Sequence, residues 1–148
     1  ASGFGGNQKL IDVLAKIPET VEPHKPSVVI LHAGVNDIAT PVDWPTLQTR
    51  YTNVFDALLA VDSVTDVVVC VPPSSLNFDA GQKAVLSSAR SWLLALNRPG
   101  VTVVDTGMAM TTGDGVTTDP AKVVDQIHPN AVGRQAMGDV LDNYLLAL

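Results

Sequence analysis

The 148-residue sequence has one cysteine, little charge and few basic residues, and each shortage excludes a class of protein. Cys70 alone cannot form an internal disulfide, and it excludes a cysteine-rich zinc site. With 9 Lys and Arg against 15 Asp and Glu, the net charge of −6 argues against a nucleic-acid partner. No apolar run approaches the ~18 residues of a membrane span, and no signal-peptide pattern opens the chain. We therefore expect neither a nucleic-acid nor a membrane partner.

Apolar residues are plentiful and make up 46% of the sequence. At this length such a chain can bury a core without disulfides or metals, and its low charge argues against disorder. The length also suits one domain better than two. The sequence therefore predicts a single domain over residues 1–148. Its compartment stays open, because one buried cysteine suits either redox environment.

Three short runs rich in β-branched residues are typical of strands. They are Ser27–Ala33, Asp66–Val71 and Val101–Val104, each bounded by Pro, Gly or Asp. Apolar residues follow one another in these runs instead of alternating with polar ones, which indicates strands covered on both faces. We therefore expect three buried parallel strands.

Amphipathic helical patterns separate these runs. The first begins near Leu10 and is expected to end at Pro18, and the next two follow Asp43 and Asp79 as N-caps. The closing helix is expected to bury the stripe Val132, Ala136, Val140, Leu141, Tyr144 and Leu145. Strands that alternate with helices predict an α/β fold with a parallel sheet and helices on both faces.

Polar clusters come directly after the strands or before a helix. Gly34–Asp37 follows the first strand, Asp125–Asn130 precedes the last helix, and Ser2–Gly6 opens the chain. Ligands collect at the carboxyl ends of strands in an open parallel sheet. We therefore expect these three clusters to converge on one edge of the sheet.

Each cluster has a chemical interpretation. Asp125 can hold the imidazole of His128 by its Nδ1, which fixes the tautomer and supports the charged ring. The Asn36 amide and the Gly3 N–H can both donate to an oxyanion. Asp37 is expected to support its loop by accepting from nearby backbone N–H groups.

Each cluster also has a structural interpretation. Asn36 and Asp37 are ordinary turn residues, and His128 can be half of a surface pair followed by a helix that starts at Pro129. The glycines near Gly3 can simply be a flexible entrance. His32, inside a predicted strand, fits a core histidine better than a ligand. These alternatives stay open for each cluster taken alone.

Together the clusters resemble the SGNH (GDSL-type) hydrolases. Gly34-Val35-Asn36-Asp37 matches the family's Gly-x-Asn-Asp block, and Asp125-x-x-His128 matches its terminal block. Ala1–Phe4 resembles the block of the oxyanion glycine, with Gly3 in that role. The resemblance implies His128 and Asp125 as catalytic residues and Asn36 and Gly3 as the oxyanion hole. Gly34 and Asp37 would support the loop.

The Gly-Asp-Ser block that carries the family's nucleophile is absent from the sequence. Ser2 belongs to the glycine block, Ser74 and Ser75 match a family loop, and no serine lies in a Gly-x-Ser-x-Gly elbow. The nucleophile is therefore unknown and lies outside this chain.

The resemblance implies a flavodoxin-like three-layer α/β/α fold with strand order 2-1-3-4-5. The three strands found here would be the last three of that sheet. Ser27–Ala33 would then leave an apolar sheet edge unpaired, which proteins avoid. We therefore expect two strands from a segment upstream of Ala1 or from another chain.

These observations favour an esterase that cleaves a small ester or an acetylated carbohydrate by Ser-His-Asp chemistry. No cofactor and no metal is expected, because the sequence offers no ligand cluster. A non-catalytic binding or structural module of a larger assembly is the alternative, if the serine has been lost. A generic flavodoxin-like ligand domain is a third interpretation. It is disfavoured, because it does not explain why Asn36 stands beside Asp37 and Asp125 stands three residues before His128.

Overall fold

The computed structural model describes residues 8–40 and 42–146, and in them parallel strands alternate with helices. The strands are β1 (Val28–Leu31), β2 (Asp66–Cys70) and β3 (Val101–Val104), in the sheet order β1-β2-β3. Val28 to Leu31 pair in register with Asp66 to Val69. The predicted α/β class with a parallel sheet is confirmed, and the strand positions agree with the predicted runs to within a few residues.

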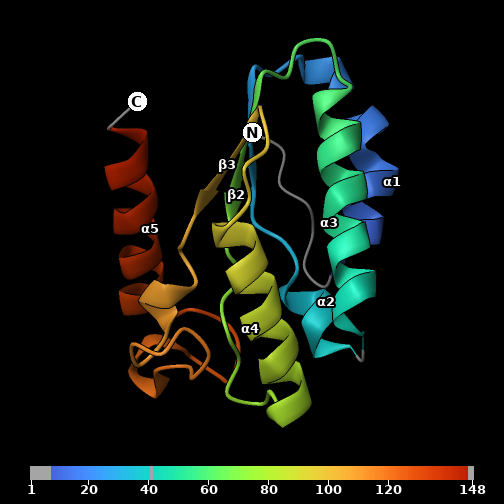
Figure 1. Ribbon diagram of the computed structural model, residues 1–148. Coiled ribbons are helices and arrows are strands. Elements are labelled where there is room, and N and C mark those ends of the chain that lie inside the picture. The colour runs from blue at the N-terminus through green and yellow to red at the C-terminus, as the bar shows by residue number, and fades with distance from the viewer. Residues whose placement is uncertain (1–7, 41, 147–148) are drawn as a thin grey trace. The chain divides into compact units, whose positions relative to one another are not determined.

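The chain forms two compact units. The first spans the chain up to Val69 together with Asn97–Thr102. It contains the helices α1 (Leu10–Thr20), α2 (Val35–Ala39) and α3 (Trp44–Leu59), and the 3-10 helix η1 (Glu22–His24). Helices α1 and α3 pack side by side (Figure 1). The two helices supply fully buried residues of the core, which are Leu10, Leu47, Tyr51, Val54, Phe55 and Leu58.

The second unit consists of Cys70–Leu96 and Val103–Leu148. It contains α4 (Ala80–Leu94), α5 (Ala131–Leu145) and the 3-10 helices η2 (Met108–Met110) and η3 (Pro120–Lys122). Helix α5 packs on both 3-10 helices, over a small core of Met110, Val123 and Met137. None of the described helices is long and apolar enough to cross a membrane.

The N-caps predicted for α3 and α4 are confirmed. Asp43 accepts from the Thr46 N–H, and Asp79 accepts from the Gln82 N–H. The expected end of α1 at Pro18 was wrong, because the helix continues to Thr20. A proline removes only one backbone N–H, and the packing of α1 on α3 holds the helix beyond it.

Burial differs between the strands. In β2, every residue after Asp66 is buried, as expected for a strand covered on both faces. In β1, however, Val28 is 46% and Ile30 48% exposed, because β1 lies at the edge of the sheet and the described residues leave one of its faces uncovered. His32 is also exposed, so its interpretation as a core histidine was wrong. It lies past the end of β1.

Helix α5 buries a different face from the one predicted. Its buried residues are Gly133 and Met137, whereas Val132 is 60% exposed and Leu145 is exposed as well. The helix begins at Ala131 with Asn130 as its N-cap, so the proposed start at Pro129 was also wrong. Gly133 fits because a side chain there would overlap the Lys122 carbonyl of η3. The close approach of the η3 backbone, and not the apolar stripe, therefore determines which face of α5 is buried.

Candidate active site

The Gly34–Asp37 segment turns directly from β1 into the short helix α2. Gly34 has φ 108°, in the left-handed region that favours glycine. The Tyr51 hydroxyl donates to the Ala33 carbonyl at 2.8 Å. A Cβ on Gly34 would overlap that hydroxyl and lie 2.9 Å from the ring atom Cζ. The turn therefore requires glycine for its conformation and for its space.

Gly34→Ala should lower the free energy of unfolding by about 2–4 kcal/mol, the combined effect of left-handed strain and overpacking against Tyr51. Urea unfolding measures it. Gly138→Ala is the matched control, because its Cβ would meet no atom within 4 Å and alanine favours the α5 helix by up to about 1 kcal/mol. A loss below about 0.5 kcal/mol at Gly34 would show that the turn adapts.

Asn36 lies in the first turn of α2, half-buried. Its Nδ2 donates to the Gln8 carbonyl at 3.0 Å. An amide nitrogen carries two hydrogens, so this bond leaves it the capacity to donate a second. Asn36 is thus held by one hydrogen of its amide and can offer the other to a ligand.

Asp37 is fully buried, and its carboxylate bonds to residues that are distant in the sequence. Its Oδ2 accepts from the Leu10 N–H at 2.9 Å, and its Oδ1 pairs with Arg50 Nη1 at 2.7 Å. We expected bonds to nearby N–H groups, but the Leu10 donor belongs to the first turn of α1, where backbone N–H groups lack helical acceptors. Asn36 and Asp37 thus fasten α2 to the backbone that enters α1.

Asp125 and His128 lie in contact just before α5. Asp125 Oδ2 is 2.8 Å from His128 Nδ1, and its Oδ1 accepts from the N–H groups of Ile127 and His128. These bonds, the His128 N–H first, hold the pKa of the Asp125 carboxyl far below its ordinary value. Both side chains are more than half exposed. Asp125 therefore stays a carboxylate beside an accessible imidazole.

The turn between Asp125 and His128 is supported by the segment that follows β2. The Gln126 carbonyl accepts from the Ser75 hydroxyl at 2.9 Å and from the Leu76 N–H at 2.8 Å. The buried Ser75 is thus a support of this turn that the sequence reasoning missed, because its partner is 51 residues away.

The structure brings the predicted residues together in two groups. Asn36 and Asp37 belong to the first unit, Asp125 and His128 to the second, and Gly3 lies outside the described residues. Burial raises the pKa of the Cys70 thiol, which disfavours the thiolate that a cysteine nucleophile needs. Within residues 8–40 and 42–146, no three His, Cys, Asp or Glu side chains are grouped as metal ligands.

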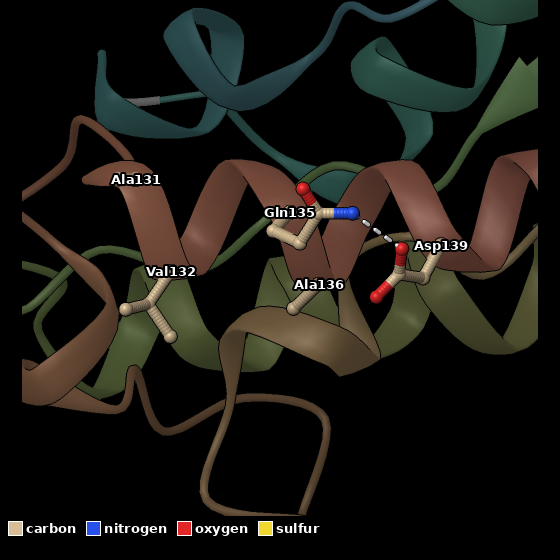
Figure 2. Close-up of a pocket in the computed structure, with 5 residues that line it drawn as sticks. All are labelled: Ala131, Val132, Gln135, Ala136 and Asp139. Carbon is tan, nitrogen blue, oxygen red and sulfur yellow. Dashed lines mark hydrogen bonds between the residues drawn. The ribbon is translucent and has the colours of Figure 1, made fainter.

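A shallow groove of about 460 Å³ lies on one face of α5 (Figure 2). Its lining residues are Ala131, Val132, Gln135, Ala136 and Asp139, and Gln135 Nε2 donates to Asp139 Oδ1 at 2.6 Å. The groove contains neither His128 nor a serine or cysteine. It therefore offers neither the predicted histidine base nor a hydroxyl or thiol nucleophile of Ser or Cys.

One comparison with known protein families gives a match. A profile described as the GDSL-like Lipase/Acylhydrolase family matches residues 1–136. None of the curated protein sequences compared with the chain is significantly similar to it.

Solved structures resemble the chain closely in fold. A carbohydrate esterase family 3 structure from Talaromyces cellulolyticus has a TM-score of 0.75 at 22% identity, over 95% of this chain and 68% of that one. A GDSL-like lipase from Bacteroides thetaiotaomicron has 0.75 at 21%, over 96% and 73%. An acetylxylan esterase from Geobacillus stearothermophilus has 0.69 at 18%, over 93% and 67%.

Proposed function

This chain belongs to the GDSL-like lipase/acylhydrolase family, and we propose that it carries the base and the oxyanion donors of a serine esterase. The contact between Asp125 Oδ2 and His128 Nδ1, 2.8 Å long, is the observation that carries the proposal. A carboxylate at Nδ1 leaves Nε2 unprotonated in the neutral ring, so Nε2 can accept a proton from a hydroxyl. The exposure of His128 makes that nitrogen accessible.

In the proposed reaction, a serine from a Gly-Asp-Ser block outside this chain attacks the ester carbonyl. His128 accepts the hydroxyl proton as the serine oxygen bonds to carbon, and Asp125 holds the ring and stabilises its positive charge. His128 then gives that proton to the leaving alcohol as the ester C–O bond breaks. Water repeats the two steps on the acyl-enzyme and releases the carboxylic acid.

The tetrahedral intermediate needs hydrogen-bond donors for its oxyanion. We assign this role to the Asn36 amide, to the Gly3 N–H and to the N–H of the nucleophilic serine. The bond from Asn36 to the Gln8 carbonyl supports the assignment, because a donor that is already held loses little entropy when the charge develops. Gly34 and Asp37 hold the turn that carries Asn36.

A further strand beside β1 would bring the serine to the sheet. The exposed Val28 and Ile30 support this, because edge strands with exposed apolar residues invite pairing with another strand. The partner is an upstream segment of the same protein or another chain.

The substrate proposed is a small uncharged ester, with acetylated carbohydrates favoured. The similar structures include a carbohydrate esterase and an acetylxylan esterase, which supports this class. The net charge of −6 disfavours polyanionic substrates.

The full-length gene product should release p-nitrophenol from p-nitrophenyl acetate and acetate from acetylated xylan. The 148-residue chain alone should stay at the buffer rate, because the proposed nucleophile lies outside it. The two proteins are compared at equal concentration by absorbance. Equal activity in both would place the nucleophile inside this chain and contradict the proposal, and no activity in either would contradict the enzyme assignment.

A non-catalytic module is the second candidate, and the absence of a Gly-Asp-Ser block from the sequence favours it. The coding sequence upstream of Ala1 separates the two. An apolar strand pattern followed by Gly-Asp-Ser supports the esterase. Any other sequence there supports the binding module, unless another chain supplies the serine.

A further inference from the structure

The turn that carries Asn36 is held at both ends by consecutive residues of α3. Tyr51 contacts its first peptide and Arg50 pairs with its last residue, Asp37. We propose that Arg50 and Tyr51 are positioning residues that keep the Asn36 amide in the orientation of an oxyanion donor. The role of Asn36 itself rests on the proposed function.

At the first end, Tyr51 is fully buried, and its hydroxyl donates to the Ala33 carbonyl while filling the space beside Gly34. Its ring packs against Phe55 at 5.8 Å between centroids, which fixes the direction of the hydroxyl. Burial strongly raises the pKa of the Tyr51 hydroxyl, and the nearby Asp37 charge raises it further. The hydroxyl therefore remains a donor, and the Ala33–Gly34 peptide cannot rotate without losing that bond.

At the second end, Arg50 binds a carboxylate that has no access to water. The Asp37 side chain is 0% exposed and the Arg50 side chain 28% exposed, so the guanidinium bridges the buried carboxylate and the surface. The other carboxylate oxygen accepts from the Leu10 N–H. Arg50 thus ties the end of the turn to α3, while the Leu10 N–H ties the same carboxylate to α1.

Asn36 lies between these two fixed points, and its amide bonds the same backbone that Asp37 binds, two residues earlier at Gln8. A shift at either end of the turn would therefore move the amide. Catalytic groups displaced by about 1 Å can lose roughly a hundredfold in rate. Because Arg50 and Tyr51 act through the turn, their loss should lower kcat and leave KM nearly unchanged.

In the full-length esterase, Tyr51→Phe should lower kcat about tenfold, with KM changed less than twofold. Arg50→Met should do the same, and Arg50→Lys, which keeps the charge, should recover part of the loss. In an Asn36→Ala background the effect of Tyr51→Phe should shrink below twofold, because the donor it positions is gone. Tyr144→Phe, the same change on α5, should leave kcat unchanged.

Equal losses from Tyr51→Phe in the wild-type and Asn36→Ala backgrounds, or no loss at all, would overturn the positioning role. If Asn36→Ala itself leaves kcat unchanged, the oxyanion assignment under the proposed function fails instead.

A measurement without activity completes the test. In the NMR spectrum of the 148-residue chain, the Asn36 side-chain amide should shift and exchange faster with solvent in Tyr51→Phe and Arg50→Lys. An unchanged Asn36 resonance in both variants would overturn the positioning role whether or not the protein is an esterase.

Discussion

His128→Ala in the full-length protein is expected to lower kcat/KM on p-nitrophenyl acetate by about 10³–10⁴-fold, because no other group then removes the serine proton. His24→Ala is the matched control: it removes an exposed histidine of η1 and should leave the rate unchanged. Initial rates at pH 7–8 measure both. A His128→Ala rate within tenfold of wild type would exclude His128 as the general base.

The pH dependence of the hydrolysis rate is a second test of the Asp125–His128 pair. Hydrolysis should fall as the solution becomes acidic, because a protonated His128 cannot accept the serine proton. Asp125 should not contribute to that fall, since its depressed pKa keeps the carboxylate ionised well into acid. One proton should therefore account for the loss of rate. A rate that stays constant as the solution is acidified would contradict the mechanism.

Contacts that form within a few residues could be predicted from the sequence. The contact of Asp125 with His128, three residues apart, was expected from spacing alone, as were the caps at Asp43 and Asp79. Each depends on the geometry of one turn, which a short segment sets by itself.

Contacts between distant segments were not predictable in the same way. Asp37 binds Leu10 across 27 residues, and Ser75 binds Gln126 across 51. The apolar run Ser27–Ala33 by itself predicted a strand covered on both faces, and the exposure of Val28 and Ile30 contradicts that. The edge position of this strand was expected only from the family resemblance. Tertiary packing decided these features, and a single sequence carries no local signal for them.

Asp37→Ala is expected to lower the free energy of unfolding by about 3–5 kcal/mol. It leaves the Arg50 guanidinium without its buried counterion and the Leu10 N–H without its acceptor. A loss of this size is a large share of the roughly 5–15 kcal/mol that stabilises a typical domain. Urea unfolding of the 148-residue chain, followed by circular dichroism, measures it.

Asp56→Ala provides the matched control, since Asp56 also lies on α3 and also pairs with an arginine, Arg98, but its side chain is 62% exposed. That change should cost less than about 1 kcal/mol. The double variant Asp37→Leu, Arg50→Met removes both charges and should recover part of the loss, but not all of it, because the Leu10 N–H stays without its acceptor. Equal losses at Asp37 and Asp56 would mean that burial adds nothing to the Asp37 pair. The turn that carries Asn36 would then depend on the Tyr51 hydroxyl and on the bond from Asn36 to the Gln8 carbonyl.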